Sequence, residues 1–180
     1  MGYVSIPDNL EVQSGLYKKL AETIQISIGT INYESLENRI VFQQKGVNIG
    51  EGKETYARVI LKTILGNSGD FPFLNSNTKL SSTELNELSE EFKNQTFSVY
   101  GIKLIDWHGV VNINLNGKYN GIKYSYSRQT GDKPPVYVEL YRIFNNDRLH
   151  EITLSYRIQD SYIWKPLYKI ISQSILIDKH

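Results

Sequence analysis

The triplet Asp106-Trp107-His108 holds the pair of side chains in this sequence best suited to proton transfer. If the segment is a strand, Asp106 and His108 share one face, and a carboxylate beside an imidazole can orient and charge it for general-base catalysis. The alternative is a solvent-facing ion pair at a sheet edge. We favour this alternative because no G-x-S-x-G motif and no cysteine supplies a nucleophile, so we assign no catalytic residue.

A second set of candidate residues consists of aromatic and basic side chains later in the chain. Alternation within a strand places Tyr124, Tyr126 and Arg128 on one face. Tyrosine and arginine are enriched where proteins bind other molecules, although the tyrosines could instead pack beneath helices with their hydroxyls at the rim. We predict a ligand-binding set of Asp106, His108, Tyr124, Tyr126 and Arg128. In the enzymatic alternative, a small hydrolase or isomerase, the Asp-His pair would face a pocket lined by Tyr126 and Arg128.

The sequence offers no pattern typical of a metal or cofactor site, and we expect neither. The three histidines, His108, His150 and His180, form no H-E-x-x-H motif or comparable cluster. The loop 66–70 has oxygen donors but lacks the repeated acidic positions of an EF-hand. The glycine-rich segment 46–53 lacks the spacing of a phosphate-binding loop, and indicates a hairpin tip.

Composition limits the class of protein. The chain has 180 residues, 40% of them hydrophobic, and 20 Lys and Arg residues against 19 Asp and Glu residues. These values are typical of one soluble globular domain over residues 1–180. On folding, a domain of this size buries roughly 70% of the surface that its unfolded chain exposes, so it needs no disulfides. A charge of +1 excludes a strongly basic nucleic-acid binder, and no apolar run approaches the roughly 18–20 residues that cross a bilayer. The absence of cysteine excludes thiol chemistry but does not select a compartment.

The elements predicted for the first hundred residues mix strands and helices. We expect strands at 3–6, 39–44 and 55–65, an amphipathic helix from residue 16, and a helix at 82–95. The segment 55–65 also fits a helical period, but its β-branched residues and the Gly66-Asn67-Ser68-Gly69 turn favour a strand. Ser81 and Glu84 have the spacing of a capping box at the start of the 82–95 helix.

From Ile102 onward the apolar period changes to two, which predicts four consecutive strands. Asn116-Gly117 and Asn120-Gly121 are both hairpin signals. The segment 136–144 is apolar on both faces and should pair with 149–158 in the middle of the sheet. A helix beginning near Trp164 should close the chain. This order predicts an α+β fold, an antiparallel β-sheet of about six or seven strands sandwiched by helices.

Several stretches carry a resemblance to known proteins: Val4-Ser5-Ile6-Pro7, Leu154-Ser155-Tyr156-Arg157 and Tyr162-Ile163-Trp164-Lys165-Pro166. They resemble the PsbP-like domains, which share a fold with the Mog proteins that bind Ran. Within that group, Gly66-Asn67-Ser68-Gly69-Asp70-Phe71 and Tyr126-Ser127-Arg128-Gln129 look like uncharacterised secreted members from Bacteroidetes-type bacteria. The resemblance implies a helix-covered antiparallel sheet and an extracytoplasmic location after removal of a leader. It implies neither photosynthesis nor Ran binding, because function lies in sites rather than in folds.

The interpretation that we favour is a non-catalytic binding or accessory domain for a protein or small-molecule ligand. A complete fold pattern without a catalytic signature motivates it. The alternatives are the small hydrolase or isomerase described above and a structural domain of an envelope assembly.

Overall fold

A seven-stranded antiparallel sheet forms the centre of the computed structural model, which describes residues 2–27, 38–52, 55–74, 79–98 and 101–178. In spatial order its strands are β2 (Leu10–Val12), β3 (Arg39–Gln44), β4 (Ala57–Leu65), β8 (Arg148–Arg157), β7 (Val136–Asn145), β6 (Tyr119–Thr130) and β5 (Ile102–Leu115). Two short strands, β1 (Gly2–Tyr3) and β9 (Leu176–Ile177), pair with each other. The helices are α1 (Gly15–Ser27), α2 (Ser82–Phe97) and α3 (Ser161–Ser174), with 3-10 turns η2 (Val47–Ile49) and η3 (Ile158–Asp160).

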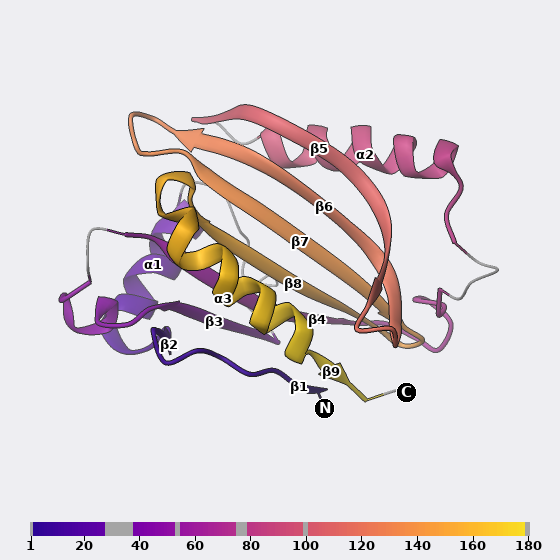
Figure 1. Cartoon of the computed structure of the whole chain (residues 1–180), viewed down its shortest axis with the longest axis horizontal. Coiled ribbons are helices and arrows are strands. Elements are labelled where there is room, and N and C mark those ends of the chain that lie inside the picture. The colour runs from indigo at the N-terminus through magenta and orange to yellow at the C-terminus, as the bar shows by residue number, and fades with distance from the viewer. Residues whose placement is uncertain (1, 28–37, 53–54, 75–78, 99–100, 179–180) are drawn as a thin grey trace.

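The helices cover both faces of the sheet, which confirms the predicted α+β sandwich. Figure 1 shows α3 in front of the sheet, α2 behind its β5 and β6 edge, and α1 behind β3. The pair β7 and β8 lies in the middle of the sheet, as the two-sided apolar pattern of these segments predicted.

The larger hydrophobic core lies between α3 and the sheet. Trp164, Tyr168 and Ile171 of α3 pack against buried residues that include Val59 and Leu154. A smaller core under α2 contains Phe92, Val110, Ile122 and Tyr124. The two hydrophobic cores therefore lie on opposite faces of the sheet.

Three local predictions need correction. The N-terminal strand spans only Gly2–Tyr3 rather than 3–6. Helix α3 begins at Ser161, directly after the η3 turn, rather than near Trp164. Pro166 therefore lies inside the helix, on the side that is exposed to solvent. Helix α1 forms as expected, but its apolar stripe does not pack inward, since Leu16 and Leu20 are exposed. Amphipathic spacing predicted this helix but not the surface that its stripe would contact.

The two Asn-Gly pairs have different roles. Asn116 and Gly117 both have positive φ, 57° and 70°, and turn the chain between β5 and β6. Such angles suit the tight turns that match the twist of a hairpin. The second pair is not a turn, since Gly121 lies inside β6 opposite Ile143. Here glycine is required by space, because a Cβ atom would collide with the carbonyl oxygen of Arg142 on β7.

Replacement of Gly121 by alanine should therefore destabilise the domain by about 1–3 kcal/mol, the usual range for overpacking in a tightly packed region. The free energy of unfolding in urea measures this effect. Gly101→Ala is the control, because its Cβ would enter open space and only its φ of 82° opposes alanine. Equal stability of Gly121→Ala and wild type would contradict the close approach of β6 and β7.

Candidate functional site

A groove of about 930 Å³ runs between α3 and the central strands, and we call it the α3 groove. Its floor is formed by Lys123 of β6 together with Tyr137, Glu139 and Tyr141 of β7. Its wall includes Tyr162, Lys165 and Lys169 of α3. The floor residues alternate along β7, so the strand period of two that was visible in the sequence places them on one face.

An ion pair occupies the floor of the α3 groove. Lys123 Nζ lies 2.8 Å from Glu139 Oε1, and both side chains are largely shielded from solvent. Lys123 Nζ is also 5.9 Å from the centre of the Tyr141 ring. Burial, reinforced by the charge of Glu139, raises the pKa of Tyr141, so that its phenol stays protonated and can donate a hydrogen bond. The floor thus presents neutral phenols beside an internally balanced charge pair.

Tyrosine rings in tilted and edge-to-face contact join the groove floor to α3. The rings of Tyr137 and Tyr156 are 5.4 Å apart, as are those of Tyr156 and Tyr168. The Tyr168 hydroxyl donates to the Ser155 carbonyl oxygen at 2.6 Å and accepts from the Arg58 backbone N–H at 3.0 Å. It thereby connects α3 to the backbones of β4 and β8.

Removal of this hydroxyl in Tyr168→Phe should cost about 1–3 kcal/mol, because it leaves buried backbone groups without their partner. Equilibrium unfolding in urea gives the value. Tyr162→Phe removes the hydroxyl of an exposed tyrosine on the same helix and should change the free energy of unfolding by less than about 0.5 kcal/mol. A stable Tyr168→Phe variant would mean that β4 and β8 satisfy these groups without α3.

The predicted pair Asp106 and His108 does come together, at one end of the α3 groove. His108 Nε2 lies 3.5 Å from Asp106 Oδ2, and both side chains are exposed. The His108 ring is 6.2 Å from that of Tyr137, which lines the groove. The β5–β6 pairing is irregular here, with register shifts on both sides of Trp107. Among the described residues no hydroxyl group is hydrogen bonded to His108, and the imidazole and the carboxylate are both accessible to solvent.

The other predicted residues lie on the opposite face, beneath α2. The Tyr124 ring is 5.1 Å from Phe92, and the Tyr126 ring is 5.4 Å from Phe97. Burial raises the pKa of both tyrosines. Arg128 Nη1 donates to Thr130 Oγ1 at 3.1 Å. These tyrosines pack under a helix, which was the alternative that the sequence left open.

The sheet therefore separates the five predicted binding residues into two groups. Trp107 pairs with Tyr126 and donates from Nε1 to Ser89 of α2, so its neighbours Asp106 and His108 point to the other face. A single pocket lined by His108, Tyr126 and Arg128 does not form. In the sequence Trp107 indicates only that Asp106 and His108 face away from an apolar side chain, because alternate residues of a strand face opposite ways. The face that Tyr126 shares with Trp107 depends on the register of β5 against β6.

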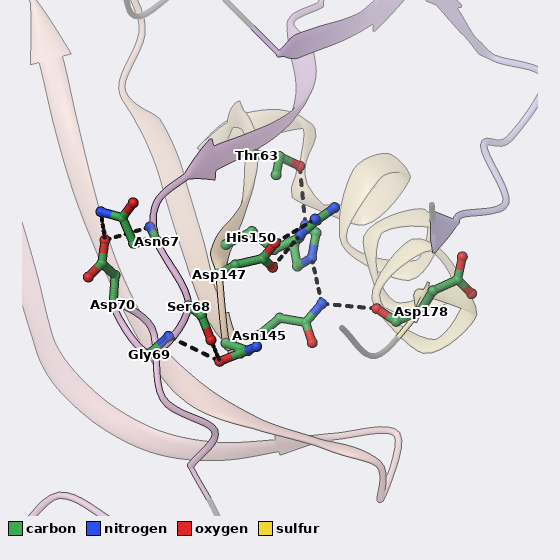
Figure 2. A network of polar contacts seen from close by, with 11 residues as sticks. Thr63, Asn67, Ser68, Gly69, Asp70, Asn145, Asp147, His150 and Asp178 are labelled. Carbon is green, nitrogen blue, oxygen red and sulfur yellow. Dashed lines mark hydrogen bonds and ion pairs between the residues drawn. The ribbon is translucent and has the colours of Figure 1, made fainter.

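A polar network at the beginning of β8, away from the Asp106 and His108 pair, places a hydroxyl, an imidazole and an amide in line (Figure 2). Thr63 Oγ1 is 3.2 Å from His150 Nδ1, and Asn145 Nδ2 is 3.3 Å from His150 Nε2. Asn145 Nδ2 also donates to the Asp178 carbonyl oxygen at 2.9 Å. Because an amide nitrogen only donates, Nε2 accepts and the ring proton lies on Nδ1. His150 then donates to Thr63 and cannot activate it, so this network connects the C-terminal segment to the sheet. Sequence reasoning considered His150 only as a metal ligand.

The described residues hold neither a metal-ligand cluster nor a helix that could span a membrane. Among those residues no three His, Asp or Glu side chains converge as ligands. Nor do the described helices include one with the length and apolar character needed to cross a bilayer.

Comparison with known proteins shows the fold alone. No family model matches the chain, and neither does any curated protein. A crystal structure from Bacteroides thetaiotaomicron superimposes with a TM-score of 0.52 at 7% identity over 99% of this chain, which spans only 46% of that protein. LpqN, involved in cell envelope biogenesis of Mycobacterium tuberculosis, gives 0.50 at 9% identity over 98% of this chain and 83% of its own. Cyanobacterial PsbP from Synechocystis sp. PCC 6803 gives 0.49 at 11% identity, covering 99% and 92%.

The likenesses to the Bacteroides thetaiotaomicron structure and to LpqN support the architecture and assign no role to any residue. PsbP, the family named by the resemblance in the sequence, is among the structures that the chain is similar to. The Mog-type and Bacteroidetes-type parts of that resemblance stay predictions.

Proposed function

We propose that this chain is a non-catalytic binding or accessory domain that works outside the cytoplasm and holds its ligand in the α3 groove. The observation that carries the proposal is the groove itself, an open volume of about 930 Å³ lined by tyrosines. Tyrosine gives a large contact area with a directional hydrogen bond, and it is enriched at binding surfaces.

The charge of the groove favours an acidic ligand. Lys123 is neutralised by Glu139, whereas Lys165 and Lys169 on the α3 wall have no ion pair among the described residues. The groove therefore presents two further positive charges above a floor of phenol rings. An acidic peptide segment that also carries aromatic side chains combines the two kinds of contact, ring stacking and charge.

Two synthetic heptapeptides with equal tyrosine content, one rich in glutamate and the other in lysine, test this assignment. A ligand present at a concentration of about 100 times its dissociation constant raises the free energy of unfolding by about 2.7 kcal/mol. For a domain of this size, that raises Tm by about 5–10 °C. We expect that rise with the glutamate peptide and none with the lysine peptide.

Matched tyrosine variants localise the binding. Tyr162→Ala removes a 77% exposed ring from the groove wall, and Tyr3→Ala removes a 62% exposed ring far from it. We expect the glutamate peptide to lose its effect on Tyr162→Ala and to keep it on Tyr3→Ala. Equal responses from both variants, or no response from wild type, would refute the groove as the binding site.

Location outside the cytoplasm rests on the sequence resemblance and on the likeness to LpqN, which is involved in cell envelope biogenesis. Fractionation of the source cells, followed by immunodetection of this chain, checks it. Recovery in the cytoplasmic fraction alone would overturn this part of the proposal.

The enzymatic alternative is favoured by one observation, the position of Asp106 and His108 at the end of the groove. His108→Ala separates the two functions. An exposed ion pair contributes about 0–1 kcal/mol, so the variant should fold and still bind the glutamate peptide. Ester or peptide hydrolysis by wild type that disappears in His108→Ala would instead establish catalysis.

A further inference from the structure

A row of charged side chains crosses the sheet on the face opposite the α3 groove. The strand register places Arg39 of β3 opposite Lys62 of β4, Lys62 opposite Glu151 of β8, and Glu151 opposite Arg142 of β7. Glu151 Oε1 accepts from Arg142 Nε at 2.8 Å, so the only carboxylate of the row is already engaged. Arg39 and Lys62 thus face each other as like charges, an arrangement that destabilises a sheet unless something else neutralises it.

Arg58 adds a third positive charge to this face. It lies four residues before Lys62 on β4, on the same side of the strand, and its guanidinium is 5.7 Å from the Tyr56 ring centre. Its cross-strand neighbour Gln43 carries no charge to balance it, and the Gln43 side chain is hydrogen bonded to Gln13 and Asn48.

The Nε atoms of Arg39 and Arg58 are buried, and no hydrogen-bond partner for either lies within the described part of the chain. Buried donors of this kind are rare in folded proteins, since each costs free energy. The carboxylate that acts on Arg39 most directly is Glu22 of α1, whose ion pair is with Lys18 at 3.9 Å. Burial and then the charge of Arg58 lower the pKa of Arg39, yet a guanidinium does not lose its proton in a protein. The guanidinium therefore stays charged, and among the described residues it has no ion pair with a carboxylate, Glu22 acting on it only as a nearby charge.

We propose that Arg39 and Arg58 together bind a small oxyanion of the phosphate or sulfate class. Guanidinium groups match the oxygens of these anions through paired N–H donors, and two of them supply the charge that balances a dianion. Lys62 adds a further positive charge beside Arg39. This site is independent of the α3 groove, because the sheet lies between them.

Calorimetric titration of the intact chain with inorganic phosphate and with sulfate tests the site. We expect binding by wild type and a dissociation constant at least about tenfold weaker in Arg58→Gln, since the loss of a charged hydrogen-bond partner is worth about 1.5–3 kcal/mol. Arg58→Lys keeps the charge but loses the planar fork, and should fall between the two. Arg128→Gln removes the same charge from the same face of the sheet and should bind as wild type does.

Stability in anion-free buffer gives a second readout. If these positive charges are balanced only when an anion is bound, then without the anion each of the substitutions Arg39→Gln and Arg58→Gln removes a repulsion. Both variants should then have a Tm equal to or higher than that of wild type. Phosphate should then raise the Tm of wild type and not that of the variants. A lower Tm of Arg58→Gln without anion would show an internal structural role and overturn the proposal.

The source of the anion follows from a third titration, with glycerol phosphate. Tighter binding of this ester than of inorganic phosphate would assign the site to the phosphate group of a larger molecule, and weaker binding would assign it to the free ion. Absence of heat with all three probes at millimolar concentration, or an equal loss in Arg128→Gln, would refute a site at Arg39 and Arg58.

Discussion

Alkaline pH should unfold this protein in one cooperative transition that begins above about pH 10, the ordinary pKa of tyrosine. Burial raises the pKa of Tyr124 and Tyr168 well above that value. Below about pH 10 both the folded and the unfolded states keep these phenols protonated, and stability is complete. Above it only the unfolded chain loses the protons, so folding weakens as the pH rises toward the folded pKa values.

The expected effect is large because several phenols act together. One such tyrosine removes about 1.4 kcal/mol per pH unit, so Tyr124 and Tyr168 together remove about 2.7 kcal/mol per unit. A domain with a stability of about 5–15 kcal/mol is then unfolded within a few pH units. Tyr126, Tyr137, Tyr141 and Tyr156 have pKa values shifted in the same direction and add to the effect.

Tyrosinate absorbance and far-ultraviolet circular dichroism, recorded along one pH titration, measure this transition. We expect the two signals to change together. Tyr124→Phe should move the midpoint to higher pH, and Tyr3→Phe, which changes an exposed tyrosine, should leave it in place. Gradual ionisation of all tyrosines with the circular dichroism signal retained would contradict the burial of these phenols.

Replacement of Trp164 by alanine should destabilise the domain by about 3–5 kcal/mol, the range for large aromatic residues in a core. Trp164 is 2% exposed and packs α3 onto the sheet beside Tyr168. Its Nε1 donates to Thr55 Oγ1 at 2.9 Å, and that hydroxyl donates to Asp160 just before α3. The variant therefore loses both the packing of α3 and the polar contact at the start of the helix.

Urea unfolding monitored by circular dichroism gives the stability of this variant. Trp164→Phe keeps most of the packing and should retain more stability than Trp164→Ala. Tyr162→Ala changes an exposed aromatic residue of the same helix and should stay within about 0.5 kcal/mol of wild type. A loss below about 1 kcal/mol in Trp164→Ala would show that α3 contributes little to the fold.

Features that depend on neighbours in the sequence were predictable from the sequence alone. The capping box of α2 is present as its spacing predicted, since Ser81 N–H donates to Glu84 Oε2 at 2.7 Å and Glu84 N–H to Ser81 Oγ at 3.3 Å. The pairing of β7 with β8 follows from a tight turn between two apolar segments. Together these short-range signals determined the helix-covered antiparallel sheet, because each needs only a few consecutive residues to form.

The tertiary structure alone decided which side chains meet. Strand periodicity placed Asp106 and His108 on one face and Tyr124 and Tyr126 on one face, but only the register of β5 against β6 showed that these are opposite faces. The meeting of Arg39 with Lys62 depends likewise on the pairing of β3 with β4. A shift of one residue in register exchanges the faces of a strand, and no local pattern in the sequence encodes register between separate strands.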